Sequence, residues 1–248
     1  MYIDHTIASI LLVGSSLLLS YFLSLGKERE ILLSSVRVAF QLIFLGFIFN
    51  FIFNIKSIYG ILGILFFMTL MASLISGTRI NVRGKFKNSF ISIFLATFIP
   101  MIIMLIIGVV DADPYQLIPI GGLVLGNALN SVTLSVDRLK GELVNRIYEI
   151  EGKIALGADL KTAMRESMRE SIKTAIIPKI NMLQSAGIVH IPGITVGMLM
   201  AGADPFTSVI YQLTVLYLIL FIGIFSGYIM LEVGYRDIFL SCVENITK

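Results

Sequence analysis

The segment EGKIALGADLKTAMRESMRESIKTAIIP, residues 151–178, is the one long polar stretch in an otherwise apolar chain. It lies between two apolar runs and carries charged residues at helical spacing. Gly157 interrupts the segment after a first helical stretch, and Pro178 closes it at the edge of the next apolar run. We interpret this segment as the surface through which a soluble partner acts on a membrane domain.

The composition around this segment requires a lipid environment. The 248 residues are 56% hydrophobic and only 14% charged, whereas soluble domains carry about 25% charged residues. A soluble fold of this length could not hide so much apolar surface from water. The net charge of +3 gives no reason to expect a nucleic-acid partner. The sequence therefore predicts an all-α, polytopic protein of the cell membrane, with residues 1–248 forming a single transmembrane domain.

Seven apolar runs reach the ~20 residues that a helix needs to cross the hydrocarbon core of a bilayer. The first run has no basic flank and no small-residue cleavage site, so we expect a retained span rather than a removed signal. The predicted spans are roughly residues 5–25, 36–55, 58–77, 90–110, 116–137, 179–203 and 206–230.

The charges between the runs predict the orientation, because basic loops stay in the cytoplasm. The loop RINVRGKFKN, residues 79–88, has four bases and no acid, so we expect it inside. The loop DADPYQ, residues 111–116, has two acids and no base and is expected outside. Lys27 and Arg29 then fall inside and Lys56 outside. The N-terminus is predicted to be outside, and the C-terminus and residues 138–178 inside.

Two outer loops end in Asp-Pro, at Asp113-Pro114 and Asp204-Pro205. An N-cap aspartate followed by proline at the first helical position is a common helix start, and Gln116 fits a capping box with Asp113. A cation site formed by these acids is the alternative, but helix capping explains the spacing without it.

The polar segment is predicted to be a helix–turn–helix between the fifth and sixth spans. Residues 138–156 continue the fifth span as a helix, with Glu142–Arg146 and Glu149–Lys153 pairs on its polar face. Gly157 ends this helix, and Asp159 begins the next. A solvated hairpin without a partner is the alternative, although the segment is long for a connector. The expected apolar stripes are Leu139, Leu143, Ile147, Ile150 and Ile154, then Leu160, Ala163, Met164, Met168, Ile172 and Ala175.

The sixth span is polar and is broken at Pro192-Gly193. A break at membrane depth frees backbone groups that lipid cannot satisfy, so it belongs in the protein interior or along an aqueous path. His190 lies beside the break, and with Met198 and Met200 it offers borderline or soft metal ligands. A structural hydrogen bond of His190 across a helix interface is the simpler interpretation, because no Cys or acid lies at ligand spacing.

Polar residues at membrane depth usually face the bundle and cluster along substrate routes. The predicted translocation pathway consists of Gln41, Asn127, Asn130, Asn181, Gln184, His190, Pro192, Gly193 and Met198.

Two stretches flanking the polar segment, GGLVLGNALNSVTLSVDRLKGEL (121–143) and IPGITVGMLMAGADPFTSVIYQ (191–212), resemble the permease subunit of the Fet-type ABC transporter family. Bacterial members are linked to iron export, and plant relatives to aluminium tolerance. The polar segment also resembles the EAA loop of ABC permeases. Glu151, Gly157 and Pro178 stand at matching positions, and Gly152 and Lys153 replace the two alanines.

This resemblance implies a division of labour between two proteins. The chain has no GxxxxGK[ST] phosphate loop, so ATP and Mg²⁺ would bind to a separate ABC ATPase subunit that docks on the helix–turn–helix. Two ATPase sites would require two copies of this chain, a homodimer. No cofactor and no catalytic residue are expected here. The residues predicted to couple the ATPase to transport are Glu151, Gly157, Asp159, Arg165 and Pro178.

The sequence is compatible with three possible functions. The preferred one is the permease half of an ATP-driven exporter of iron or another metal ion, and the resemblance carries most of its weight. A stand-alone secondary transporter of a small solute would be expected to show an acid inside a span or a matching pair of broken helices. A membrane-embedded enzyme would require clustered acids, histidines or a nucleophile. Nothing in the sequence selects iron over another metal.

Overall fold

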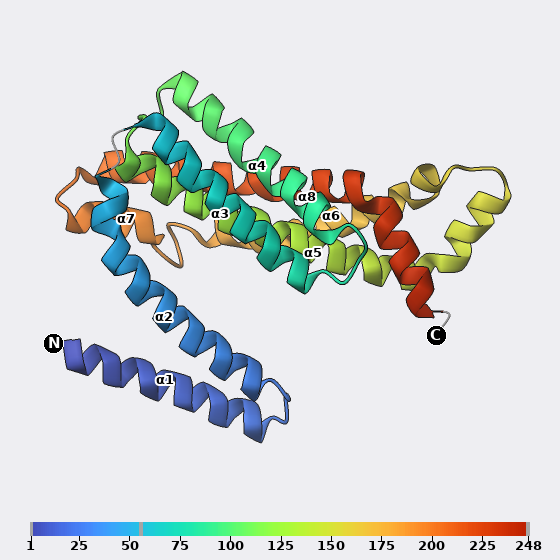
Figure 1. Ribbon diagram of the computed structural model, residues 1–248, viewed down its shortest axis with the longest axis horizontal. Helices are drawn as coiled ribbons and strands as arrows, with labels where there is room; N and C mark the ends of the chain where they lie inside the picture. The colour runs from blue at the N-terminus through green and yellow to red at the C-terminus, as the bar shows by residue number, and fades with distance from the viewer. Residues whose placement is uncertain (1, 55–56, 247–248) are drawn as a thin grey trace. The chain divides into compact units, whose positions relative to one another are not determined.

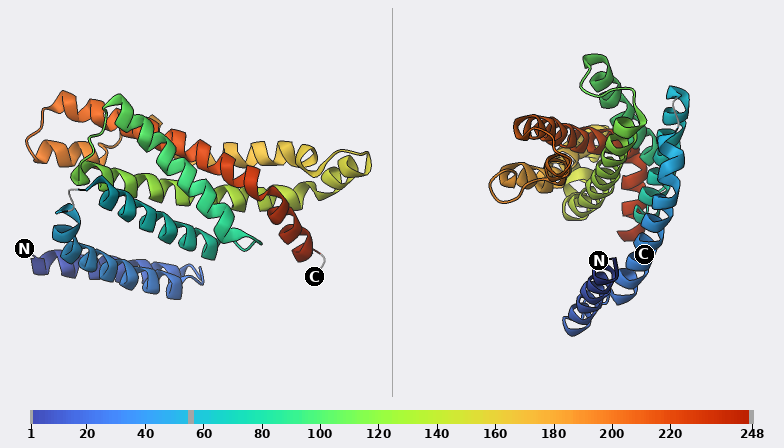
Figure 2. Two further views of the ribbon diagram at one scale, coloured as in Figure 1. Left: turned by 45° about the horizontal axis from the view of Figure 1, so that its top comes forward. Right: turned by 90° about the vertical axis from the view of Figure 1, so that its left-hand side faces the viewer.

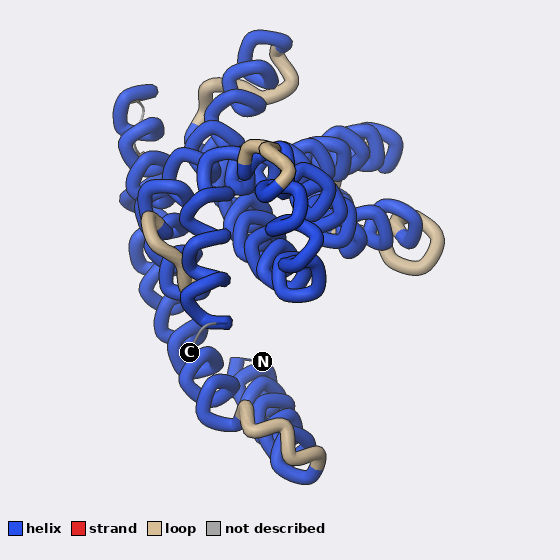
Figure 3. Tube along the Cα trace, turned by 90° about the vertical axis from the view of Figure 1, so that its right-hand side faces the viewer, coloured by secondary structure: helices blue, strands red, loops and turns tan. Residues whose placement is uncertain are grey.

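The computed structural model describes residues 2–54 and 57–246, and these form eight α-helices (Figure 1). Figure 3 shows that the described residues form helices (blue) joined by loops and turns (tan). In the described ranges the one β-type pairing is an isolated bridge between Ala186 and His190. The chain divides into two compact units, residues 1–56 and 57–248. The prediction that they form a single domain stays a prediction.

The first unit is a pair of contacting helices, α1 (Tyr2–Phe22) and α2 (Glu28–Phe53). Its turn is fixed locally, because the hydroxyl of Ser20 donates a 2.8 Å hydrogen bond to the carboxylate of Glu28. Helix α2 begins eight residues before the predicted second span, since Glu28 and Glu30 favour a helix N-terminus. Lys56, expected outside, lies beyond the described residues.

The second unit contains α3 (Ile58–Arg79), α4 (Lys85–Ile107), α5 (Pro114–Ala155), α6 (Leu160–Ser185), α7 (Gly193–Met200) and α8 (Pro205–Ile246). Its long helices alternate in direction (Figures 1 and 2). The connections 80–84 and 156–159 therefore lie toward the end where α8 finishes. The Asp-Pro loops before α5 and α8 lie at the opposite end. The basic loop and the polar turn thus share one end of this unit.

Five helices in the described ranges are long and apolar enough to cross a membrane: α2, α3, α4, α5 and α8. The apolar stretch Thr6–Phe22 of α1 is shorter. The predicted span 179–203 is not one helix. It consists of the end of α6, an irregular segment at residues 186–192, and the eight-residue α7. The break is thus wider than the Pro192-Gly193 step expected from the sequence, because Gly187 already leaves helical geometry at φ +80°.

Helices α5 and α8, each 42 residues long, form the centre of the second unit. Helix α5 contacts α3, α4, α6 and α8, and α8 contacts α4, α5, α6 and α7. Leu125, Val132 and Ile222 are buried in this core. The helices approach closely at small residues. For example, a Cβ at Gly227 of α8 would lie 2.5 Å from the hydroxyl oxygen of Ser135 on α5.

One detail of residues 138–178, which we call the polar arm, differs from the prediction, and another adds to it. Helix α5 is not uniform through residues 138–156, because Arg146 has non-helical torsions (φ −120°, ψ 17°) and marks a kink. Pro178 does not end its helix, since α6 continues through it to Ser185. A proline inside a helix removes one backbone hydrogen bond, but this one is followed by seven more helical residues.

Candidate functional site

The turn between α5 and α6 is built as the sequence predicts. Gly157 has φ +96°, and its N–H donates to the carbonyl of Ile154 at 2.9 Å. The N–H of Ala158 donates to the carbonyl of Lys153 at 3.0 Å. These two bonds form a Schellman motif, which satisfies the carbonyls at the end of α5. The predicted end of the helix at Gly157 is confirmed.

Asp159 begins the second helix of the turn, again as predicted. Its carboxylate accepts a 3.2 Å hydrogen bond from the backbone N–H of Thr162. Hydrogen bonds from Thr162 hold the pKa of Asp159 below its ordinary value. The cap therefore stays charged at neutral pH and interacts favourably with the positive end of α6.

The inner faces of the arm carry most of the predicted apolar stripes. Leu139, Leu143 and Ile150 of α5 are buried. Ala163, Met164, Met168 and Ala175 of α6 are buried as well. Ile154 departs from the prediction, because its side chain is 38% exposed. The arm is therefore a packed pair of helices rather than two independent ones, which agrees with the contact between α5 and α6.

An ion cluster links the two helices just before the turn. The guanidinium of Arg146 binds Glu149 at 2.8 Å and also Glu166 of α6 at 2.8 Å. Lys153 binds Glu149 at 2.6 Å, as predicted. The predicted Glu142–Arg146 pair is wrong, because the kink at Arg146 turns its side chain toward Glu149 and Glu166. This cluster ties the kinked part of α5 to the first turns of α6.

The outer surface of the arm exposes large apolar side chains among its charges. Leu156 is 90% exposed and Tyr148 is 86% exposed. Glu151, Gly157 and Asp159, in the same stretch of the chain, are exposed as well. Sequence patterning missed Tyr148 and Leu156 as surface residues. A signal was available, since neither falls on the buried stripe. Exposed apolar groups rimmed by polar residues are typical of a protein–protein contact surface. We call Tyr148, Glu151, Leu156, Gly157 and Asp159 the turn surface.

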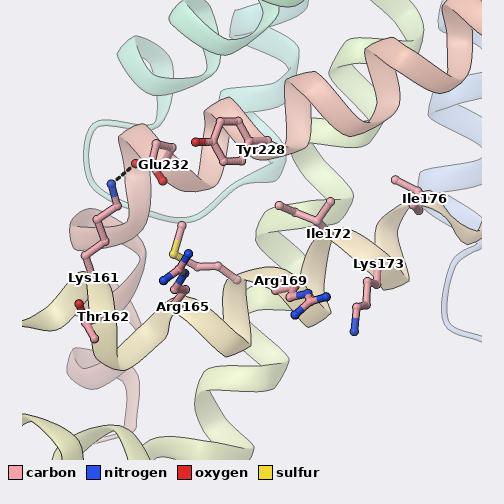
Figure 4. Close-up of a pocket in the computed structure, with 10 residues that line it drawn as sticks. Lys161, Thr162, Arg165, Arg169, Ile172, Lys173, Ile176, Tyr228 and Glu232 are labelled. Atoms are coloured by element: carbon pink, nitrogen blue, oxygen red, sulfur yellow. Dashed lines mark hydrogen bonds and ion pairs between the residues drawn. The ribbon is translucent and has the colours of Figure 1, made fainter. Parts of the chain in front are cut away.

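The other two predicted coupling residues lie apart from the turn surface. Arg165 lines a groove between α6 and α8 (Figure 4). Pro178 lies far along α6, about 27 Å along the helix axis from the first residue of α6 at the standard rise per residue. A role for Arg165 and Pro178 in coupling stays a prediction.

The broken segment is held by its own hydrogen bonds. The N–H of Gly187 donates to the carbonyl of His190 at 2.9 Å, and the His190 Nδ1 lies 3.2 Å from the hydroxyl of Ser185. His190 is exposed, and so is Met200, at 85%. Within residues 2–54 and 57–246, no three His, Cys, Asp or Glu side chains cluster as metal ligands. The hydrogen bond of His190 is thus local, to Ser185, rather than across a helix interface.

Gln212 of α8 holds the start of α7, and sequence analysis missed it. Its side-chain oxygen accepts a 3.3 Å hydrogen bond from the backbone N–H of Thr195, and both residues are buried. The N–H groups in the first turn of a helix have no partner within that helix. Gln212 therefore caps α7 from a neighbouring helix. Both residues line a cavity of about 520 Å³, together with Pro192.

Among the predicted pathway residues of the second unit, Pro192 and Asn130 line two different cavities. Asn127 donates a 2.9 Å bond to the carbonyl of Leu123 in its own helix. Asn130 lines a different groove, near Arg79 and Lys140. The remaining predicted residues Gln41, Asn181, Gln184 and Gly193 are exposed, and Met198 is partly buried. Their role in transport stays a prediction.

The outer Asp-Pro loops form caps. The carboxylate of Asp113 accepts from the N–H of Tyr115 at 3.1 Å, and that of Asp204 accepts from the N–H of Thr207 at 2.8 Å. The predicted capping box of Gln116 with Asp113 is wrong. The amide of Gln116 instead donates to the carboxylate of Asp111 at 3.0 Å, because residues 111–113 turn Asp111 back over the start of α5.

The chain is similar to a known protein family and to several known proteins. The model of a family described as an uncharacterised protein family, UPF0014, matches residues 3–239. The "Probable iron export permease protein FetB" of Escherichia coli is 30% identical over 94% of this chain and 90% of its own length. "UPF0014 membrane protein slr1647" of Synechocystis is 29% identical over 92% and 90%. "Protein ALUMINUM SENSITIVE 3" of Arabidopsis thaliana is 28% identical over 84% and 77%.

No solved structure matches the chain. The resemblance drawn from the sequence is confirmed by the family match and by these relatives. The relatives are named as a permease and as membrane proteins. Together with the span-length apolar helices, they identify a multi-pass membrane protein.

Proposed function

The chain belongs to the uncharacterised protein family UPF0014, and from that premise we propose that it is the membrane-spanning permease subunit of an ABC transporter that exports iron or another metal ion. The relative named as a probable iron export permease supports both the transport activity and the class of substrate. ATP and Mg²⁺ would bind to a separate ATPase subunit, and two copies of this chain would form the membrane domain.

We place seven crossings in this permease, with the N-terminus outside and the C-terminus inside. Six crossings are α1 to α5 and α8, and the seventh is the end of α6 together with α7. The positive-inside rule supports the orientation. The basic loop around Arg83 and the α5–α6 turn lie at the same end of the second unit, and that end would face the cytoplasm.

The turn surface carries the proposal for ATPase docking. Leu156 and Tyr148 are almost fully exposed on the polar arm, where lipid does not cover them if the arm projects into the cytoplasm. A partner protein that buried both side chains would gain roughly 1.5–3 kcal/mol for each of them. Glu151 and Asp159 supply charge at the rim of the same surface.

Motion of the docked ATPase would reach the bundle by two routes. Helix α6 leads directly from the turn into the broken segment. Helix α5 leads to the core, but its kink at Arg146 makes the arm a hinged lever, joined to α6 by the Arg146–Glu166 pair. Two arrangements of this hinge would provide the two states that alternating access requires.

The experiment is a pull-down of the detergent-solubilised chain from its native membrane, with identification of co-purifying proteins by mass spectrometry. The wild type is expected to retain an ATPase subunit, and Tyr148→Ser with Leu156→Ser is expected to lose it. The control is Tyr59→Ser, which removes an 83% exposed tyrosine from α3 and should retain the partner.

A second readout tests coupling in the reconstituted complex. Glu151→Gln is expected to leave ATPase activity in place while transport falls. A chain that purifies alone, and that moves a small solute without ATP after reconstitution, would instead be a stand-alone secondary transporter and would refute the proposal.

A further inference from the structure

A groove between α6 and α8 carries a line of four cations. Lys161, Arg165, Arg169 and Lys173 follow one another at intervals of four residues and line the groove along α6 (Figure 4). Residues four apart lie on one face of a helix. The groove has a volume of about 550 Å³, and the one acid that lines it is Glu232. Its charge is therefore strongly positive.

Two of the four cations are already paired. Lys161 forms an ion pair with Glu232 of α8, and this pair raises the pKa of Lys161. Lys173 binds Glu170 at 2.5 Å. Within the described part of the chain, Arg165 and Arg169 form no ion pair. They are exposed in the middle of the groove, so two guanidinium groups are available to an anion.

Apolar side chains line the groove together with its cations. On α6 these are Met168 and Ile172, which alternate with the cations, and Ile176, which lies past Lys173; α8 contributes Tyr228. From Lys161 to Ile176 it follows α6 for about 22 Å. A ligand that fits it combines a compact anionic group with an apolar chain.

Its depth in the membrane favours a lipid. Helix α8 has no charged residue from Pro205 to Leu231, and Glu232 is the first. Tyr228 lies one turn before Glu232. Tyrosines are enriched at the membrane–water interface. The groove therefore spans the level of the lipid headgroups. Basic pockets between membrane helices at this level bind anionic headgroups.

We propose that the α6–α8 groove binds an anionic phospholipid, with the phosphate between Arg165 and Arg169 and one acyl chain along Ile172 and Ile176. The bound lipid would join the polar arm to α8 at the membrane surface. The proposal does not depend on the transported substrate or on the ATPase.

The test uses the purified full-length chain in detergent, with dioleoyl phosphatidylglycerol as the probe and phosphatidylcholine as the neutral reference. Retained lipid is measured by native mass spectrometry, and thermal stability is measured in parallel. Phosphatidylglycerol is expected to be retained and to raise the Tm, and phosphatidylcholine is not. Arg165→Gln with Arg169→Gln is expected to raise the lipid concentration needed for half-maximal stabilisation roughly 10- to 30-fold.

Two control variants separate a site from general charge attraction. Lys85→Gln with Lys87→Gln removes the same charge from exposed positions of α4 and should leave lipid retention unchanged. Arg165→Lys with Arg169→Lys keeps the charge and should recover most of the binding. Equal loss in the Lys85/Lys87 control would overturn the proposal.

Three further outcomes would also overturn it. Equal retention of the two lipids would mean that the groove does not recognise the headgroup. An equal Tm increase with soluble glycerol 3-phosphate would mean that the groove binds a free phosphate rather than a lipid. The variant Ile176→Asn separates the two, because it should weaken phosphatidylglycerol binding and leave any effect of the free phosphate unchanged. Loss of a co-purifying protein from the Arg165/Arg169 double glutamine variant, with lipid retention intact, would assign the groove to a protein partner.

Discussion

The side chain of Lys179 on α6 lies across Gly223 of α8, in the space that a Cβ at residue 223 would occupy. Gly223 lies within the uncharged stretch of α8 that precedes Glu232. A lysine is therefore packed at membrane depth. Within the described residues no hydrogen bond or ion pair of Lys179 is found. From the sequence, Lys179 is only the first residue of the predicted span 179–203.

Lys179→Met is expected to stabilise the protein while reducing transport. Methionine keeps an unbranched chain over Gly223 and removes an ammonium group that is costly at this depth. The Tm should rise by ~3 °C, in line with about 1 kcal/mol for a chain of this size. Transport should fall, because ionisable residues inside membrane bundles usually serve function.

The control for Lys179 is Gly223→Ala, which keeps the charge and forces the lysine out of its position. Thermal unfolding and vesicle transport assays would be run on both variants. A lower Tm in Lys179→Met would show that the ammonium group has a stabilising partner, contrary to this account.

Gly157→Ala is expected to destabilise the α5–α6 turn. The residue has φ +96°, and a left-handed conformation costs roughly 1–2 kcal/mol for a residue with a Cβ. The loss should appear as faster amide hydrogen exchange in residues 154–163. ATPase activity should then continue without full transport in the assembled complex. The control is Gly152→Ala, at a helical position where a Cβ meets no neighbour within 4 Å. Equal behaviour of the two variants would rule out a special role for the turn.

Gly121→Ala is expected to destabilise the packing of α5 against α3. A Cβ at this position would overlap the side chain of Leu65, which is only 2% exposed and cannot easily move aside. Overpacking of this kind costs about 1–3 kcal/mol. Thermal unfolding measures the effect. Gly126→Ala, five residues further along α5, where a Cβ meets no neighbour within 4 Å, should be neutral. A similar Tm loss in both variants would contradict the packing argument.

Gln212→Leu is expected to loosen α7. The N–H of Thr195 would lose its acceptor while remaining buried, at a cost of about 1–3 kcal/mol. Hydrogen exchange should become faster at residues 193–197 with little change elsewhere. Thr214→Val is the matched control on the same helix, since among the described residues the Thr214 hydroxyl bonds only to the carbonyl of Ile210 in its own helix. Unchanged exchange at α7 in Gln212→Leu would show that the cap is dispensable.

The parts of the fold that follow from local chemistry could be predicted from the sequence. Helices end at Gly157 and begin after Asp113, Asp159 and Asp204. The glycine adopts the left-handed backbone that a helix end requires, and each aspartate side chain accepts a hydrogen bond from a nearby backbone N–H. The buried stripes of the arm follow from helical periodicity in the same way. Long apolar runs likewise predicted α3, α4 and α8, although α8 extends well beyond its predicted span. The fifth span and its predicted helical continuation through residue 156 together match α5.

The features that depend on partners far apart in the sequence could not be predicted. Arg146 was assigned to Glu142 by spacing, but the kink directs it to Glu149 and to Glu166, twenty residues away. The bond from Thr195 to Gln212 has no sequence signal, because a glutamine in an apolar run can cap any neighbouring helix or none. Polar residues of the predicted pathway were expected to converge, yet Asn127 bonds within its own helix.

The hydrogen bond of 2.8 Å between Asn88 of α4 and Asp237 of α8 joins residues 149 positions apart. Its consequence concerns the order of biosynthesis. Asn88 would leave the ribosome long before Asp237 has been synthesised, and the same holds for the surfaces of α4 to α7 that α8 covers. During synthesis, polar groups and small-residue faces of α4 to α7 therefore stay exposed until α8 has been made. An insertase or chaperone that shields α4 and α5 in this interval would determine how much of the protein reaches its folded state.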